Sequence, residues 1–336
     1  MVARMTIKEI ARLSGVGVST VSRVLNKRPD VNEDPRGRVM EVIERYGYEP
    51  NSNAKHLKQL STDCVAVIVR GRNNLFFSGI LELLQKRIEA AGLRFLPHYI
   101  DENDDEAAAA LRVYAERKVR GIIFMGGCHT DNGAMLSRLP IPCVYSTVNA
   151  AEGYAPNVSS VSVDDRQGAK KAIDYLFDCG HENMVILSGE TQGCNMAHQR
   201  YLGVLDSFKE HGKTLESSRV LVSPFSFSCA YERIKEYTGP DYTAIFAMSD
   251  TMAIGAARAL MDSGKRVPED VSVIGYDGIE LAQYYHPALA TMRQPQQELA
   301  DRSVELLLES MDTDCAPKHI QLETELIQGA SVKHIS

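Results

Sequence analysis

The chain has 336 residues, of which 44% are hydrophobic and 24% are charged, and its formal net charge is −7. This length predicts two or three domains of about 100–200 residues each. No stretch approaches the ~20 apolar residues of a membrane span, the N-terminus lacks a signal-peptide core, and the seven cysteines include no CxxC pair. We therefore expect a cytoplasmic protein without a disulfide framework, a metal site or a cofactor.

The charge is distributed unevenly along the chain. Residues 1–60 contain eleven Lys and Arg against seven Asp and Glu, a net charge of +4, and the remainder carries −11. A basic N-terminal part on an acidic body indicates that only the N-terminal part binds a polyanion.

Three short helices are predicted within residues 6–46. The stretch "LSGVGVSTVSRVLN" places a glycine pair between two helical patterns, and the second helix should begin near Val18 with Gly17 as its N-cap. The third should run from about Asp34 to Tyr46 with Asn32 as its N-cap, and "YGYEPN" ends it. Its expected buried residues are Val39, Val42, Ile43 and Tyr46.

The second helix has a polar outer face. Val21, Val24 and Leu25 should pack inward, which leaves the following side chains outside: Ser19, Thr20, Ser22, Arg23 and Asn26. An arginine can donate two hydrogen bonds to a guanine in the major groove, and hydroxyls can reach bases or phosphates. An ordinary solvated face is the alternative for this helix alone, but the turn, the third helix and the basic charge favour DNA binding.

Residues 51–59 form a short polar segment. Nine residues are too few for an isolated helix, which needs about 12–15, yet Ala54, Leu57 and Lys58 would share one helical face. A linker that folds on DNA and inserts Leu57 between base steps of the minor groove would explain this pattern. The alternative is a plain interdomain linker.

From Cys64 onward, apolar runs alternate with helical patterns. "CVAVIV", "RFLPHYI", "GIIFMG" and "PCVYS" form one series, and "NMVILSG", "RVLVSP", "AIFAMSD" and "VSVIGYD" form a second, with a switch near residues 159–165. Such alternation predicts two doubly wound parallel sheets. A helix at about 296–311 and the strand-like run "KHIQLETELI" then remain, and we expect them to complete the earlier sheets.

Polar and aromatic side chains stand at the ends of the predicted strands, where open α/β sheets bind ligands. They are Phe76, Phe77, Thr147, Ser249, Asp250 and Asp277, and Arg200 and Phe225 join them from neighbouring segments. An arginine and an aspartate can hold a small polar molecule, while phenylalanines supply flat apolar surface. In the alternative interpretation the phenylalanines are core residues and Asp250 caps the following helix.

The ordered motifs resemble one family. "MTIKEIARLSGVGVSTVSRVLN" and "RVMEVIERYGYEPNSNAKHL" are similar to the head and hinge of lactose/galactose-repressor-type (LacI/GalR) regulators, and "SVDDRQGAKKAIDYL" and "VPEDVSVIGYDGIELAQYYHPALATMRQP" continue the similarity over nearly the full chain. The resemblance implies an α/β protein that works as a homodimer. It implies an N-terminal three-helix helix-turn-helix head, a hinge helix, and a periplasmic-binding-protein-like core of two doubly wound parallel-sheet subdomains.

The resemblance also implies binding positions. The candidate DNA-binding residues are Thr6, Val18, Ser19, Thr20, Ser22, Arg23, Asn26, Asn32, Asn51, Ala54 and Leu57. The candidate effector-binding residues are Phe76, Phe77, Thr147, Arg200, Phe225, Ser249, Asp277 and Gln294. Among them, Val18 and Ser19 match positions that set operator preference, and Arg200 and Asp277 match effector-contacting positions.

The expected division of the chain has four parts. Residues 1–49 form the head, and residues 50–62 the hinge helix and linker. Residues 63–162 with 294–321 form one core subdomain, and residues 163–293 with 322–336 form the other.

The sequence departs from the family pattern at several positions. Gly17 replaces a usual serine, and Gly37 weakens the third helix by up to ~1 kcal/mol. In the core, Thr147 stands where some relatives carry aspartate, and Ser249 where many carry asparagine. The ligand class is therefore open. A sugar or sugar derivative comes first, with a nucleobase or a protein corepressor behind it.

Enzymatic functions have little support, because the sequence contains no GxSxG, HExxH or GxxxxGK motif. We expect a repressor that binds a palindromic double-stranded DNA operator and is controlled by a small-molecule effector bound between the subdomains. Ligand binding would change the subdomain orientation and the folding of the hinge on DNA. The rivals from other classes are a solute-binding protein and a sugar-modifying enzyme.

Overall fold

The computed structural model describes residues 6–25, 32–46, 63–71, 74–101, 104–127, 132–150, 153–193, 195–313 and 315–335. The chain divides into two compact units, Met1–Ser61 and Thr62–Ser336. The predicted DNA-binding residues Asn26, Asn51, Ala54 and Leu57 lie outside the described residues. No helix in the described ranges is both long and apolar enough to cross a membrane.

The first unit contains the three predicted helices, α1 (Ile7–Ser14), α2 (Val18–Leu25) and α3 (Glu33–Tyr46). Thr6 and Glu9 form a reciprocal capping box at the start of α1, and Gly15, with φ of 67°, ends the helix in the left-handed conformation. The Gly17 carbonyl accepts hydrogen bonds from Thr20 and Val21, so α2 begins where the sequence predicted. The helices enclose a small core of Ile10, Ala11, Val21, Val24 and Val39.

One expected core residue of the head is not buried. Tyr46 is 48% exposed, whereas Val39 is fully buried and Val42 and Ile43 are partly buried. α1 and α2 have eight residues each and α3 has fourteen. At about 1.5 Å of rise per residue, two short helices cannot cover the last turn of the third, so Tyr46 stays in solvent.

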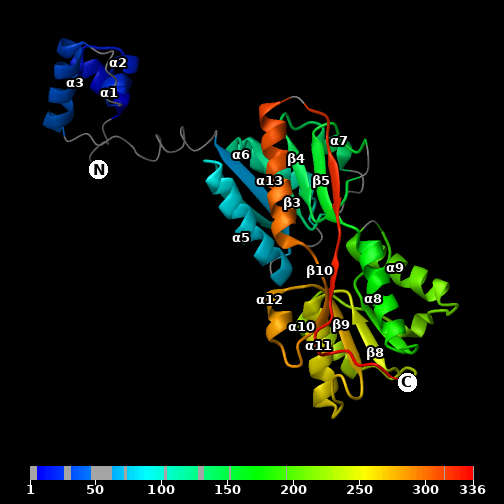
Figure 1. Cartoon of the computed structure of the whole chain (residues 1–336). Coiled ribbons are helices and arrows are strands. Elements are labelled where there is room, and N and C mark those ends of the chain that lie inside the picture. The colour runs from blue at the N-terminus through cyan, green and yellow to red at the C-terminus, as the bar shows by residue number, and fades with distance from the viewer. Residues whose placement is uncertain are drawn as a thin grey trace. The chain divides into compact units, whose positions relative to one another are not determined.

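The second unit contains two six-stranded sheets (Figure 1). The first has the strand order β11-β5-β4-β3-β1-β2 and is parallel throughout. Its strands are β1 (Cys64–Arg70), β2 (Arg94–Ile100), β3 (Gly121–Met125), β4 (Cys143–Ser146), β5 (Val158–Val163) and β11 (His319–Leu322). Its helices are α5 (Leu75–Ala90), α6 (Glu106–Arg117), α7 (Gly133–Leu136) and α13 (Gln296–Asp312). We call these elements the first subdomain.

The second sheet has the order β12-β10-β9-β8-β6-β7, in which only β12 is antiparallel to its neighbour. Its strands are β6 (Met184–Ser188), β7 (Val220–Val222), β8 (Ala244–Ala247), β9 (Ser272–Asp277), β10 (Ala290–Arg293) and β12 (Glu325–Ile327). Its helices are α8 (Asp165–Asp178), α9 (Met196–Glu210), α10 (Phe227–Lys235), α11 (Asp250–Asp262) and α12 (Glu280–Tyr284), with a 3₁₀ turn at Ser217–Arg219. These elements form the second subdomain.

Alternate residues of each buried strand face opposite helix layers. In β1, Val65 and Val67 pack in the cluster that contains α5 and α13, whereas Ala66 and Ile68 pack in the cluster that contains α6. Because helices cover both faces, central strands such as β1 and β3 are apolar over nearly their whole length instead of alternating with polar residues. The two sheets are therefore doubly wound, which confirms the predicted fold class.

The chain passes between the subdomains at three places, after β5, after β10 and between β11 and β12 (Figure 1). The run "SSVSVDD", at which a switch was expected, includes most of β5, the last strand of the first series. The run "KHIQLETELI" divides between both sheets, because β11 pairs with β5 and β12 pairs with β10.

Candidate ligand cleft and nucleic-acid interface

A cavity of about 850 Å³ in the second unit is lined by both subdomains. It lies at the carboxyl ends of the strands, the edge at which parallel sheets bind ligands. Five of the predicted effector-binding residues line it: Phe76 and Phe77 from α5, and Arg200, Phe225 and Asp277 from the second subdomain. Phe76 and Phe77 are at the same time buried core residues, which confirms the core interpretation of these rings, and their contact with an effector stays a prediction.

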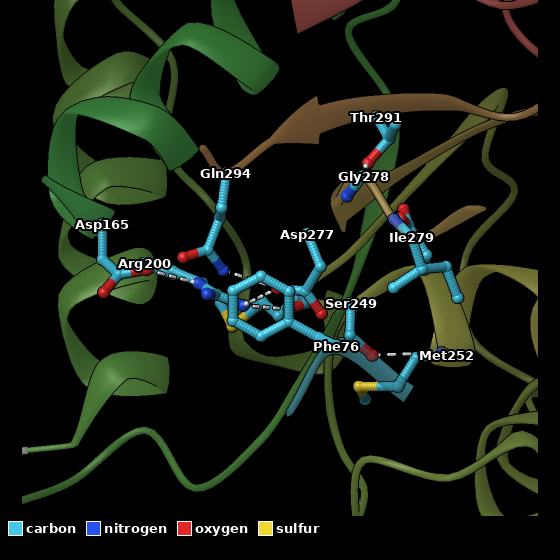
Figure 2. Close-up of polar contacts among 12 residues, drawn as sticks. Phe76, Asp165, Arg200, Ser249, Met252, Asp277, Gly278, Ile279, Thr291 and Gln294 are labelled. Atoms are coloured by element: carbon cyan, nitrogen blue, oxygen red, sulfur yellow. Dashed lines mark hydrogen bonds and ion pairs between the residues drawn. The ribbon is translucent and has the colours of Figure 1, made fainter. Parts of the chain in front are cut away.

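Arg200 is the centre of a buried polar cluster (Figure 2). It is 1% exposed, and its Nε donates to Asp165 Oδ1 at 2.7 Å. Its Nη1 donates to the Met248 carbonyl at 2.5 Å and lies 3.5 Å from Asp277 Oδ1. The guanidinium carbon lies 3.7 Å from the centre of the Tyr276 ring. This arginine therefore joins α9 to α8 and to the ends of β8 and β9.

The helix that carries Arg200, α9, starts at Met196, and Asn195 caps it by accepting from the His198 backbone N–H. Arg200 therefore lies in the second turn, where it faces the sheet.

Burial and charge act against each other in this cluster. Burial alone would lower the pKa of Arg200, but the charges of Asp165 and Asp277 raise it, so the guanidinium stays ionised. Burial raises the pKa of Asp277 to about 6 against the opposing effect of Arg200, and burial also raises the pKa of Asp165. Two buried carboxylates thus share one cation.

Asp277 has an uncommon backbone conformation. Its φ is 106°, a value that side-chain-bearing residues rarely adopt and that is often found at functional sites. Gln294 Nε2 donates to Asp277 Oδ1 at 2.8 Å. Gln294 does not itself line the main cleft, but it contacts Asp277, which does.

Two other predicted effector residues also lie outside the main cleft. Ser249 is the N-cap of α11 and accepts from the Met252 backbone N–H at 3.2 Å. Thr147, at φ of 80°, lines a smaller cavity of about 250 Å³ beside α8 and α9. The capping role considered for Asp250 is wrong, because Ser249 caps the helix and Asp250 is buried with its Oδ2 accepting from the Ile279 N–H at 2.8 Å.

The strand-end reasoning missed Arg70, which lines the cleft at the end of β1. The same rule could have found it, because an arginine directly follows the apolar run "CVAVIV". Glu106, which pairs with Arg70, gave no such signal, since it stands inside the first turn of α6.

In the first unit, α2 presents its predicted polar face. Ser19 and Arg23 are exposed, Thr20 and Ser22 are partly buried, and Val18 is 43% exposed. Short polar side chains around one arginine on an exposed helix fit the major groove.

The two candidates at helix starts differ from the residues of α2. The Thr6 hydroxyl already donates to Glu9 Oε2 at 2.9 Å, so a DNA contact through it would compete with the capping box. Asn32 precedes α3, is exposed, and its carbonyl accepts from Arg36 N–H.

Comparison with known proteins agrees with this architecture. Residues 6–51 match the model of bacterial regulatory proteins, lacI family, and residues 173–332 match a periplasmic binding protein-like domain. The chain is 34% identical to the HTH-type transcriptional regulator MalR of Clostridium butyricum, over 98% of this chain and 100% of that protein. It is 32% identical to the HTH-type transcriptional repressor PurR of Vibrio vulnificus, over 98% and 99%.

Solved structures show the same arrangement. A complex of the transcriptional regulator CelR with cellobiose has a TM-score of 0.71 and 28% identity, covering 98% of this chain and 100% of that one. A lac repressor dimer bound to operator and an anti-inducer has a TM-score of 0.74 at 23% identity, covering 98% and 99%, and supports the fold.

A helix-turn-helix head on a two-subdomain binding core defines a DNA-binding transcription regulator. The chain belongs to the lacI family of bacterial regulatory proteins. The expected family and fold are thereby confirmed.

Proposed function

We propose that this regulator is a homodimeric repressor whose operator affinity is controlled by a sugar or sugar derivative bound in the cleft between the subdomains. The observation that carries the proposal is the cleft itself, because one cavity is lined by both subdomains and holds Arg200 and Asp277 at its wall. A ligand that contacts both walls binds one subdomain orientation better than another, and it can shift the equilibrium only by that difference.

The composition of the cleft supports a small polar ligand with apolar faces. Phenylalanine rings line both walls, and arginine, asparagine and aspartate side chains surround them. Sugars present hydroxyls at their edges and apolar C–H faces, a pattern that such a pocket recognises by hydrogen bonds and ring contact. The CelR relative binds a disaccharide, cellobiose, in its solved complex.

A nucleobase is the second candidate. The similarity to PurR of Vibrio vulnificus, at 32% identity, is close to that of the MalR relative. Planar bases also stack on phenylalanine rings and accept hydrogen bonds from arginine. This candidate predicts binding of hypoxanthine or guanine and none of cellobiose.

The test is thermal unfolding of the full chain against a panel of ribose, glucose, maltose, cellobiose, hypoxanthine and guanine. A ligand at about 100 times its Kd adds ~2.7 kcal/mol of stability, and each kcal/mol raises Tm by about 2–4 °C in domains of this size. Asp277→Asn, which keeps the side-chain shape, should remove the shift. The control Arg258→Ala, at an exposed ion pair on α11, should keep it.

Operator affinity, measured with and without the active ligand, is the second test. A palindromic site selected from random DNA should bind the dimer, and the active ligand should change that affinity at least several-fold. A ligand that stabilises the protein but leaves operator affinity unchanged would contradict the control mechanism.

A further inference from the structure

The first-subdomain wall of the cleft contains a buried ion pair that the predicted site did not include. Arg70 lines the cleft with a side chain that is 17% exposed, and its Nη2 lies 3.1 Å from Glu106 Oε2. Glu106 is 1% exposed, and its second oxygen accepts a hydrogen bond from the Tyr145 hydroxyl at 2.6 Å. The Glu106 carboxylate thus pairs with Arg70 through one oxygen and accepts a hydrogen bond from the buried Tyr145 hydroxyl through the other.

The surrounding backbone keeps this cluster in place. Arg70 ends β1, Tyr145 belongs to β4, and Gly127 follows β3, which lies between them in the sheet. A Cβ atom at Gly127 would lie 2.5 Å from Glu106 Oε2 and 2.7 Å from the Tyr145 ring. Gly127 therefore packs directly on the carboxylate and the phenol, which limits their movement. Burial raises the pKa of Tyr145, and the charge of Glu106 raises it further, so the phenol remains a neutral donor.

The opposite wall has the same chemistry. Arg200 lines the cleft and is paired with the buried carboxylates Asp165 and Asp277, of which Asp277 also lines the cleft. Each wall therefore offers a guanidinium whose positive charge is already matched by a buried carboxylate.

The pairing of each cleft arginine with a buried carboxylate determines which ligands the arginines can bind. A compensated guanidinium still presents N–H donors to neutral oxygens, but it exerts little net attraction on an anion. The remaining charged residues among the described cleft lining are the carboxylates Asp104, Asp105 and Glu190. A phosphate group in this cleft would meet neutralised cations and repelling carboxylates.

We propose that Arg70 is a second effector-binding residue, that Glu106 and Tyr145 position it, and that together they select an uncharged, oxygen-rich ligand over its phosphorylated form. The inference rests on the proposed function, since it requires the effector to occupy this cleft. A ligand bonded to Arg70 and Arg200 at once bridges the two subdomains and so stabilises one orientation of them.

The experiment uses the full chain and measures Kd by calorimetry for the neutral sugars of the panel and for their 6-phosphates (5-phosphate for ribose). Glu106→Gln keeps the shape of the side chain but removes the negative charge that pairs with Arg70. Affinity for the phosphorylated sugar should rise at least about 10-fold relative to the neutral one, since a hydrogen bond to a charged group contributes ~1.5–3 kcal/mol.

Arg70→Gln changes the charge in the other direction. It removes the cation and leaves Glu106 beneath the cleft, so the neutral sugar should bind about 10-fold more weakly and the phosphorylated sugar should lose still more. Arg70 lies at the cleft surface, so this variant tests the idea even where Glu106→Gln fails to fold. Arg120→Ala is the matched control, since this exposed arginine belongs to the same subdomain and pairs with Asp63.

Opposite shifts in selectivity in the two variants support the proposal. Equal losses for neutral and phosphorylated sugars in both variants would show that the cluster only supports the fold, and would overturn it. A wild-type chain that binds a nucleobase or no sugar at all contradicts the sugar proposal itself, and the inference falls with it. A sugar that binds wild type and is lost in Asp277→Asn but not in Arg70→Gln overturns only the role of Arg70.

Discussion

Arg200 Nη1 and Asp277 Oδ1 lie 3.5 Å apart inside a cluster that contains a second carboxylate, Asp165, at 2.7 Å from Arg200 Nε. All three side chains are buried, and Arg200 and Asp277 also line the ligand cleft. The same pair thus takes part in folding of the second subdomain and in the chemistry of the cleft. Two buried carboxylates on one guanidinium make the stability of this core sensitive to substitution and to pH.

Substitution of Arg200 should be strongly destabilising. Arg200→Ala leaves Asp165 and Asp277 without their cation, and removing one partner of a buried pair costs about 3–5 kcal/mol. Denaturant unfolding of the full chain should show that loss in the transition of the core. Arg258→Ala, which breaks an exposed pair with Asp262, should cost less than about 1 kcal/mol. Equal losses in the two variants would contradict the buried-pair account.

Stability of the core should fall as pH rises from about 4 to about 6. Asp277 has a pKa of about 6 in the folded protein against an ordinary value of 3.8, so the folded state holds its proton more tightly than the unfolded state. Its stabilising contribution is complete below pH 3.8 and is lost as pH passes 6, a difference of about 3 kcal/mol.

The comparison with Asp277→Asn isolates this effect. Asparagine cannot ionise, so the difference in unfolding free energy between wild type and variant should change across pH 4–7. Burial raises the pKa of Asp165 and Asp250 as well, but both residues remain in the variant. Parallel stability curves for the two proteins would rule out Asp277 as the titrating group.

Gly37→Ala should stabilise the head. Gly37 stands inside α3, and a Cβ atom there would meet no atom within 4 Å. Alanine loses less backbone freedom on folding than glycine, so the gain should be up to about 1 kcal/mol. Hydrogen exchange of the head amides in the full chain measures it. Gly15→Ala is the control with the opposite sign, because Gly15 ends α1 at φ of 67°.

Arg23→Ala should weaken specific DNA binding much more than non-specific binding. Arg23 is exposed on the predicted DNA-binding face of α2. Loss of a bidentate base contact costs about 1–3 kcal/mol at the specific site, and non-specific binding depends on total phosphate contacts. Fluorescence anisotropy with a selected operator and with random DNA at two salt concentrations separates the two effects. A uniform loss on both DNAs would make Arg23 a phosphate contact instead.

The local patterns of the sequence are sufficient for most of the fold. The apolar runs from Cys64 onward form strands, and the segments with helical apolar spacing within residues 7–46 form three helices. Strand-end reasoning also located Phe76, Phe77 and Asp277, because the carboxyl ends of parallel strands meet at one edge. The burial of Tyr46 was predicted wrongly, since helical spacing shows which face points inward but not how far neighbouring helices reach.

The cluster of Arg70, Glu106 and Tyr145 was decided by tertiary structure. Glu106 is 36 residues from Arg70 and 39 from Tyr145 in the sequence, and the three meet only because β1, β3 and β4 are neighbours in the first sheet. Tertiary structure also decided the roles of two predicted effector residues outside the main cleft. Ser249 caps α11, and Gln294 donates a hydrogen bond to Asp277. Hydrophobic periodicity reports on local burial and therefore determines the elements, whereas strand order and register determine which distant side chains pair, and no local pattern encodes them.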